Sequence, residues 1–296
     1  MTPEIEQLSR ALESAGYIAD ASIATAVFLA RAMSRPLLVE GDAGVGKTEL
    51  AKVLARLQKT ELIRLQCYEG LDVQTALYEW DYPRQLLTMR MAEARGQEAQ
   101  EVERRIFSRD YLLERPLLRA ISHKGGPAVL LIDEIDRADD AFEAFLLEVL
   151  SDFQVTIPEL GTLSAEHPPY VVLTSNHTRE LGDALRRRCL YLYIEHPTLE
   201  KEMRIIQSRC PEADARLSEQ VARFLGDLRR LGLVKPPGIA ETLDFTRALL
   251  TLKRDALDAG IVAETLGCLL KDRRDLASVT PTHIASMVAN AREAAP

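Results

Sequence analysis

The chain lacks any long uninterrupted apolar segment. A helix that crosses a membrane needs about 20 consecutive apolar residues. The longest candidate, residues 18–33, contains Asp20 and Arg31 together with small polar residues. The first ten residues also lack the basic segment followed by an apolar one that marks a secretory signal peptide. These absences argue against a membrane protein and lead us to expect a cytoplasmic one.

Cysteine and histidine are scarce, with four and five residues among 296. The cysteines form no C-x-x-C pair, and the histidines, including His123 and His177, show no metal-ligand spacing. Isolated cysteines in a cytosolic chain are usually buried thiols. The pattern therefore disfavours a function based on cysteine redox chemistry or on a cysteine-ligated or histidine-ligated metal.

The chain has no excess of positive charge, since 37 Lys and Arg stand against 45 Asp and Glu, for a net charge of −8. Proteins that bind DNA through its phosphates usually present a basic face. Basic residues cluster locally at 186–188, but such a run is most often a solvated helix end. Charge therefore disfavours a nucleic-acid-binding role. The charged fraction of 28%, with 15 glycines and 14 prolines, is typical of a folded globular protein.

Short apolar runs punctuate the first two thirds of the chain, and helical stretches separate them. The first helical stretch repeats Ile5, Leu8 and Leu12 at three- and four-residue steps. Runs this short and this apolar are typical of strands buried on both faces of a parallel sheet. We therefore predict an α/β fold with right-handed crossovers. The five predicted strands are residues 36–40, 61–66, 128–133, 170–176 and 190–195.

The strand pattern stops at about Thr198. The segments that follow have the periodicity of amphipathic helices, and one of them is predicted to be helical from Glu241 to Gly260. The change of pattern near Pro197 predicts two domains, an α/β core of residues 1–197 and a small helical domain of residues 198–296.

The strongest motif is G-x-x-x-x-G-K-T at residues 41–48, between the first predicted strand and a predicted helix. Glycines let the backbone approach phosphate oxygens, and the helix N-terminus adds a partial positive charge. Lys47 is predicted to reach the β- and γ-phosphates of ATP, and Thr48 to give its hydroxyl to Mg²⁺. The residues predicted to bind the nucleotide are Gly41, Asp42, Ala43, Gly44, Val45, Gly46, Lys47, Thr48 and Glu49.

A second motif is the apolar run at 129–132 that ends in Asp133 and Glu134. Its position predicts a buried strand whose carboxyl end meets the ligand. Asp133 is predicted to hold the Mg²⁺ shell, and Glu134 to orient or deprotonate the attacking water. Because many small-molecule kinases have the phosphate-binding loop without the second acid, two successive acids favour hydrolysis over phosphate transfer to a substrate.

The fourth predicted strand ends in Asn176, and three successive arginines follow at 186–188. With these features the chain resembles AAA+ ATPases. The resemblance implies that Asn176 is a polar sensor near the γ-phosphate. It also implies that Arg188, or alternatively Arg187, is the arginine finger that reaches the neighbouring subunit's nucleotide. The helical C-terminal part matches the AAA+ lid, with Arg247 opening a helix where the family places its second sensor.

Two insertions are similar to those of the MoxR branch of this family. One begins at Cys67, continues toward the third predicted strand, and has helical composition. The other alternates apolar and polar residues at 153–163, around Pro158 and Gly161, which predicts a β-hairpin. The resemblance thus implies a P-loop NTPase core with a parallel sheet, a helical insert and a hairpin before the sensor, followed by an all-helical lid.

Three segments, residues 130–162, 173–197 and 236–250, look like the subgroup that accompanies molybdenum-containing carbon monoxide dehydrogenases. This resemblance implies a chaperone-like Mg-ATPase that remodels or matures a client metalloenzyme, for example by inserting its metal centre. The implied partners are further copies of the chain in a ring, expected to be a hexamer, a von Willebrand A-domain protein, and the client enzyme. No membrane partner is expected.

Other function classes stay open at this point. A nucleic-acid motor or loader would show ATP turnover stimulated by DNA. A phosphotransferase acting alone would work independently of protein concentration and need a small-molecule acceptor. A nucleotide-gated scaffold would bind ATP with negligible hydrolysis. We expect hydrolysis, slow without a partner or client, because every motif residue is present: Lys47, Thr48, Asp133, Glu134, Asn176 and Arg188.

Overall fold

The computed structural model describes residues 2–293, so Met1 and residues 294–296, which the predicted domain limits include, lie outside the described residues. The chain forms two compact units. The first comprises residues 21–40 and 50–193, and the second comprises residues 2–20, residues 41–49 and the chain from Ile194 onward. The second unit therefore contains two early segments that the predicted core domain includes. The predicted division into two domains stays a prediction.

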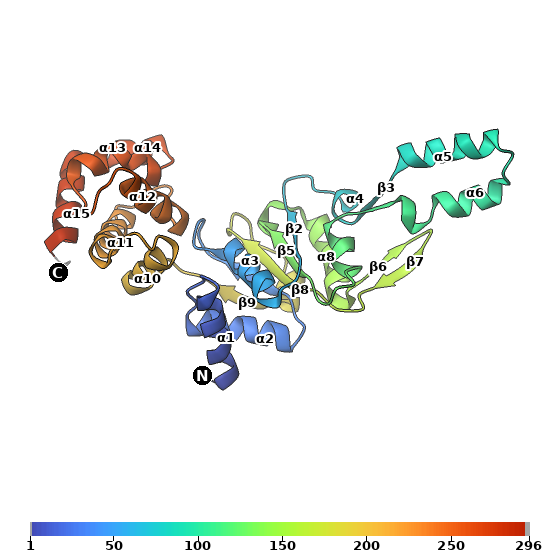
Figure 1. Cartoon of the computed structure of the whole chain (residues 1–296), viewed down its shortest axis with the longest axis horizontal. Helices are drawn as coiled ribbons and strands as arrows, with labels where there is room; N and C mark the ends of the chain where they lie inside the picture. Colours follow the sequence, from blue (N-terminus) through green and yellow to red (C-terminus); the bar gives the residue numbers. More distant parts are fainter. Residues whose placement is uncertain (1, 294–296) are drawn as a thin grey trace. The chain divides into compact units, whose positions relative to one another are not determined.

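The first unit is built on a five-stranded sheet in the order β2-β5-β8-β1-β9 (Figure 1). Every neighbouring pair of strands is parallel. All five predicted strands are present, which confirms the predicted α/β class. The strands are β1 (Leu37–Glu40), β2 (Leu62–Gln66), β5 (Val129–Asp133), β8 (Tyr170–Ser175) and β9 (Leu190–Tyr193).

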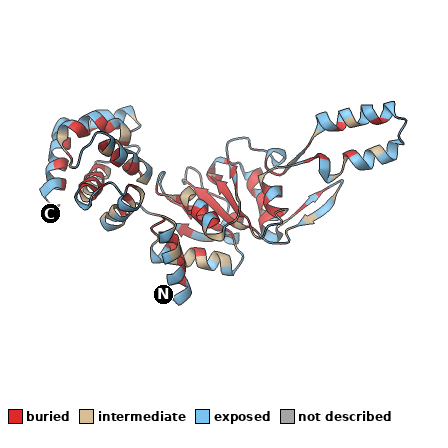
Figure 2. Ribbon diagram, in the orientation of Figure 1, coloured by how far each residue is buried: buried red, intermediate tan, exposed pale blue. Residues whose placement is uncertain are grey.

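Burial explains why these apolar runs form strands. Every residue of β1 and β5 is buried, as Figure 2 shows for the centre of the sheet. Helix α2 (Ala21–Ala32) packs against β1 and β9, and α7 (Pro116–Ile121) packs against β2 and β5. Side chains on a parallel strand that is covered on both faces are shielded from water. Successive residues of such a strand can therefore all be apolar.

The first insertion is a helical hairpin made of α5 (Tyr82–Ala94) and α6 (Ala99–Ile106). Asp81 begins α5, because its side chain accepts a hydrogen bond from the Arg84 N–H. A two-stranded antiparallel sheet, β3 (Tyr78–Trp80) with β4 (Leu112–Glu114), closes the hairpin at its base. The helical prediction is correct for this segment, but it missed the two strands, which are too short to show a periodicity. Short helices α4 (Val73–Ala76) and η1 (Arg109–Tyr111) complete it.

The second insertion is the predicted β-hairpin. Helix α8 (Asp140–Asp152) is terminated by the next residue, Phe153, which has a left-handed φ of 48°. Strand β6 (Gln154–Ile157) then pairs antiparallel with β7 (Gly161–Ser164). Between β8 and β9 lies the short helix α9 (Asp183–Arg188), and η2 (Ile135–Arg137) follows β5.

The second unit is helical apart from residues 41–46 and the connections. Its core includes the fully buried Phe224 and Phe245. The predicted continuous helix from Glu241 to Gly260 is wrong, because α12 ends at Thr251 and Asp258 caps a new helix by accepting from the Ile261 N–H. Its helices are α1 (Pro3–Ser14), α10 (Leu199–Arg209), α11 (Ala215–Arg229), α12 (Ile239–Thr251), α13 (Ala259–Leu269), α14 (Arg273–Ser278) and α15 (Pro281–Glu293).

Among residues 2–293, no helix combines the length and the apolar character that a bilayer crossing requires.

Candidate active site

The predicted phosphate-binding loop connects the end of β1 to α3 (Lys47–Gln58). Three glycines in it have positive φ angles, 150° at Gly41, 80° at Gly44 and 99° at Gly46. Side chains rarely permit these conformations. At Gly41 space also excludes a side chain, because an added Cβ would lie 2.2 Å from the carbonyl oxygen of Ile194. The loop is therefore a backbone cradle that depends on its glycines.

Lys47 is enclosed by this loop. Its Nζ donates hydrogen bonds to the carbonyl oxygens of Gly41 and Asp42, each at 2.7 Å. Only 6% of the residue is exposed. A buried ammonium group in a glycine-rich loop at the N-terminus of α3 suits a polyphosphate. The Thr48 hydroxyl and a carboxylate are the hard oxygen ligands that Mg²⁺ prefers. The residues present therefore fit Mg-ATP.

The start of helix α12 contacts the same loop. The Ile239 N–H donates to the Gly44 carbonyl at 2.8 Å, and a Cβ added to Gly238 would lie 2.7 Å from the Gly44 Cα. Glu241 closes this turn by accepting from the Gly238 N–H at 2.9 Å. The lid thus reaches the loop through the first residues of α12.

Arg247 does not open a helix, contrary to the sequence prediction. It lies about two turns after Ile239, in the interior of α12. Its exposed guanidinium is 3.4 Å from the Asp244 carboxylate. That prediction came from the resemblance to the AAA+ lid, and the sequence around Arg247 does not show where the helix begins. Its role as a second sensor stays a prediction.

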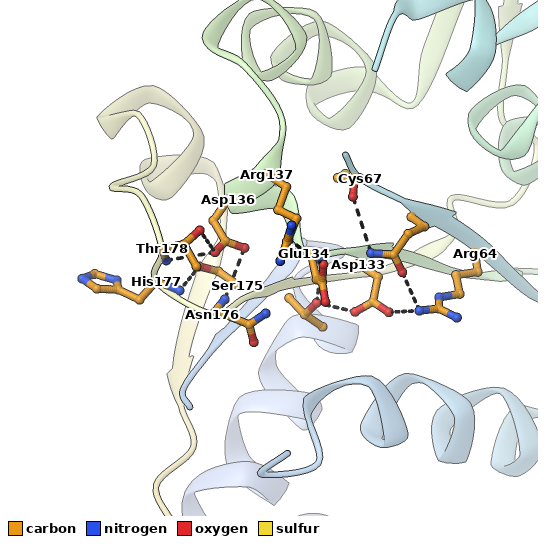
Figure 3. A network of polar contacts seen from close by, with 12 residues as sticks. Arg64, Cys67, Asp133, Glu134, Asp136, Arg137, Ser175, Asn176, His177 and Thr178 are labelled. Atoms are coloured by element: carbon orange, nitrogen blue, oxygen red, sulfur yellow. Dashed lines mark hydrogen bonds and ion pairs between the residues drawn. The ribbon is translucent and has the colours of Figure 1, made fainter. Parts of the chain in front are cut away.

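Asp133 is the last residue of β5 and is 3% exposed. Its two carboxylate oxygens are held from the two neighbouring strands (Figure 3). The Thr174 hydroxyl of β8 donates to Oδ1 at 2.5 Å, and the Arg64 guanidinium of β2 donates to Oδ2 at 2.6 Å. The carboxylate is therefore oriented before any ligand binds.

Glu134 has a different environment although it is the next residue. Its backbone is left-handed, with φ 56° and ψ 51°, a costly conformation for a residue with a side chain and one that often occurs at functional sites. Its N–H donates to the Thr174 hydroxyl at 2.9 Å, and its carboxylate lies 2.9 Å from Arg137. The Glu134 side chain is 36% exposed and that of Asp133 is 4% exposed. Their environments therefore suit two roles, a solvent-accessible base and a buried ligand.

Asn176 directly follows β8, so it lies at the same edge of the sheet as the end of β5. Its position depends on Asp136, a buried acid in η2 that the sequence reasoning missed. Asp136 accepts from the Asn176 N–H at 3.2 Å, the Thr178 N–H at 3.0 Å and the Thr178 hydroxyl at 2.6 Å. Burial opposes ionisation of this carboxyl, but the hydrogen bonds from Thr178 and Asn176 outweigh it and lower the pKa of Asp136 below its ordinary value.

Replacing Asp136 with asparagine is expected to lower the free energy of unfolding by about 2 kcal/mol at pH 7, because hydrogen bonds to a charged acceptor are lost. A carboxyl whose pKa is lower in the folded state stabilises the protein above its unfolded pKa, here near 3.8, and loses that effect as the pH falls through the folded pKa. The difference between Asp136→Asn and the native chain should therefore shrink toward pH 3. Denaturant unfolding at pH 7, 5 and 3 measures it, and a pH-independent difference would contradict this explanation.

The arginines at 186–188 are all exposed on the short helix α9. Arg188 donates to the Ser151 hydroxyl at 2.8 Å and to the Ala184 carbonyl at 3.2 Å. Arg186 lies over the Tyr191 ring at 5.8 Å. Within residues 2–293, the Arg187 side chain makes no hydrogen bond, ion pair or ring contact. Of the two predicted finger residues, Arg187 is therefore the one whose side chain has no partner among the described residues.

A parallel sheet, a glycine-rich phosphate loop at the end of β1 and an acid pair at the end of β5 define the class of P-loop nucleoside triphosphatases. Residues 36–189, just over half of the chain, match the family model described as the AAA domain of the dynein-related subfamily. The chain belongs to this family. It is an ATPase, and it uses ATP with Mg²⁺.

Curated relatives are about one quarter identical to the chain. The chain is 26% identical over 227 residues to an uncharacterized protein of Staphylococcus aureus, which covers 74% of this chain and 77% of the relative. It is 25% identical over 237 residues to the gas vesicle ATPase GvpN of Haloferax mediterranei, which covers 74% of this chain and 66% of that protein.

Solved structures of similar fold include RuvB of Thermotoga maritima, a Holliday junction branch migration motor. Its TM-score is 0.45 at 19% identity, covering 86% of this chain and 68% of that chain. A mutant of the same protein has a TM-score of 0.49 at 19% identity, covering 93% of this chain and 75% of that chain.

Proposed function

We propose that this chain is a ring-forming ATPase of the MoxR branch that uses ATP hydrolysis to remodel a client protein. The observation that carries the proposal is the pair of insertions in the AAA core. The helical hairpin α5–α6 lies between β2 and β5, and the hairpin β6–β7 lies between α8 and β8. Both extend from the same end of the first unit (Figure 1). Neither insertion contributes a strand to the five-stranded sheet, so both are available for contacts outside it.

The surface of α5 supports a role in protein contacts. Large apolar side chains on it are exposed, with Tyr82 at 58%, Leu86 at 57% and Leu87 at 60% of their surface. Met89 and Met91 extend this surface. Clustered exposed apolar residues mark surfaces that bind other proteins, and methionine adapts to partners of varied shape.

The site residues have distinct proposed roles in this ATPase. Lys47 and the loop backbone bind the phosphates, while Thr48 and Asp133 hold the Mg²⁺ that offsets their charge. Glu134 orients or deprotonates the attacking water. Asn176 acts as the polar sensor, held in place by Asp136.

The arginine finger is proposed to come from α9 of a neighbouring subunit. Arg187 is favoured because its guanidinium has no partner within residues 2–293, whereas Arg188, the first choice from sequence, is tied to Ser151 of its own chain. A positive charge supplied in this way stabilises the charge that develops on the phosphates and is worth roughly 10³ to 10⁵ in rate.

The finer proposal is a hexamer that works with a von Willebrand A-domain partner to mature a metalloenzyme of the carbon monoxide dehydrogenase type. Its support is the resemblance of residues 130–162, 173–197 and 236–250 to that subgroup. The test is the metal content of a molybdenum-containing carbon monoxide dehydrogenase produced with the native chain, with Glu134→Gln, or with neither. We expect full metal content with the native chain alone, and equal content in all three would refute the maturation role.

A further inference from the structure

Glu143, in the first turns of α8, is a buried acid that the predicted chemistry does not use. Only 5% of the residue is exposed. Its Oε2 accepts from the Gly182 N–H at 2.9 Å, and its Oε1 accepts from the Arg179 guanidinium. Gly182 is the residue that begins α9. A buried charge is costly without partners. The Glu143 carboxylate therefore needs these two contacts, and they tie the start of α9 to α8.

Arg179 strengthens the same attachment. Besides Glu143, its guanidinium donates to the Ala138 carbonyl at 2.5 Å and to the Asp140 carboxylate at 3.0 Å. These acceptors lie before and within the first turn of α8. Arg179 therefore fixes the loop before α9 at several points of α8.

The two parts of the loop from β8 to α9 are thus held by different acids. Asp136 holds its first part through Asn176 and Thr178. Glu143 holds its second part through Arg179 and Gly182. The first part carries the sensor of the subunit's own nucleotide, and the second leads into the arginines of α9. Loss of Glu143 leaves the contacts of Asp136 in place.

Helix α9 depends on such attachments for its direction. It has six residues, too few to be stable by itself. At its other end, Arg35 donates to the carbonyl oxygens of Arg187 at 2.5 Å and Arg188 at 3.2 Å. Glu143 and Arg35 therefore hold the two ends of the helix that carries the arginines.

We propose that Glu143 is a positioning residue that fixes α9 so that its arginines complete the site of the neighbouring subunit. The inference rests on the proposed function, in which an α9 arginine acts in trans. A misplacement of about 1 Å can reduce the rate of a catalysed reaction by about 100-fold. Glu143 therefore acts on the neighbour's turnover, whereas Asp136 acts on that of its own subunit.

The test mixes full-length subunits. Glu143→Ala alone should bind ATP with native affinity and hydrolyse it about 100-fold more slowly. Glu134→Gln alone should hydrolyse ATP about 10² to 10⁴ more slowly but keep a native α9. In a mixed ring, a Glu143→Ala subunit still has its own Glu134, and a neighbouring Glu134→Gln subunit supplies a correctly placed α9. The site between them is therefore complete, and turnover of the mixture should exceed the mean of the two parent variants severalfold. A mixture no more active than that mean would overturn the inference.

A parallel mixture separates this inference from the proposed function. A variant with both Arg187→Ala and Arg188→Ala, mixed with Glu134→Gln, should also regain activity. Rescue of the arginine variant without rescue of Glu143→Ala would refute the role of Glu143 alone. Rescue of neither would refute the shared site, and the inference with it.

A second variant covers the case in which Glu143→Ala does not fold. A Cβ on Gly182 would lie 3.1 Å from the Glu143 carboxylate, and the φ of Gly182, −58°, suits alanine. Gly182→Ala therefore displaces the same attachment while the Glu143 carboxylate remains to pair with Arg179. It should show a smaller loss of turnover, native ATP affinity and the same rescue by Glu134→Gln. Native turnover in Gly182→Ala, or a loss that mixing does not rescue, would count against the inference.

Discussion

Replacing Lys47 with alanine is expected to abolish ATP binding. The ammonium group lies inside the loop, where it holds the Gly41 and Asp42 carbonyls at 2.7 Å. The variant loses the charge that pairs with the phosphates and the contacts that shape the loop. Charged hydrogen bonds contribute about 1.5 to 3 kcal/mol each, so losing the bonds that Lys47 is predicted to make to the β- and γ-phosphates raises Kd by at least about 100-fold. Titration with a fluorescent ATP analogue in the presence of Mg²⁺ measures the change.

Lys52→Ala is the matched control. Lys52 is exposed on the same helix, α3, so this variant removes the same charge outside the phosphate-binding loop. It should bind ATP with near-native affinity. Native affinity in Lys47→Ala, or equal losses in both variants, would show that the loop does not bind phosphate through Lys47.

Replacing Glu134 with glutamine should leave ATP affinity unchanged and slow turnover by about 10² to 10⁴, the usual contribution of a general base. The change keeps the size of the side chain and removes the carboxylate that acts on water. Asp133, the predicted Mg²⁺ ligand, keeps its contacts with Thr174 and Arg64. Steady-state phosphate release and nucleotide titration on the same preparation separate the two effects.

Glu148→Gln provides the comparison, because Glu148 is an exposed carboxylate on α8. It should turn over ATP at the native rate. If Glu134→Gln also hydrolysed ATP normally, the catalytic role would belong to another residue. If it lost affinity instead, Glu134 would be acting as part of the binding site.

The sheet and the loop could be predicted from sequence because their determinants are local. A strand buried on both faces must be apolar at successive positions, so the runs that end at Glu40 and Asp133 are visible in the sequence. The loop needs glycine wherever φ is positive, and Gly44 and Gly46 mark those positions. The hairpin around Gly161 shows the alternation that a two-sided strand requires.

The residues that orient the site were not predictable in the same way. Asp136, Thr174 and Glu143 act through hydrogen bonds to residues about forty positions away in the chain. From the sequence alone, a buried acid just after a strand or early in a helix cannot be distinguished from an acid exposed to solvent. Only the folded loop between β8 and α9 shows that Asp136 and Glu143 are buried.

Helix ends were a separate source of error. The interval from Glu241 to Gly260 keeps an amphipathic repeat, yet the helix stops at Thr251 because Lys253 adopts a left-handed φ of 55° and Asp258 caps the next helix. The same limitation affected Arg247, since its sequence neighbours do not show that α12 begins at Ile239.

The central claim is that active sites are completed between subunits of a ring. The most direct test is Mg²⁺-dependent ATP turnover per subunit over a wide range of protein concentration, with sedimentation at the same concentrations. We predict a rate per subunit that rises steeply with concentration as the sedimenting species changes from monomer to ring. A rate that does not depend on concentration, from a chain that sediments as a monomer throughout, would contradict the shared site and indicate a self-contained ATPase.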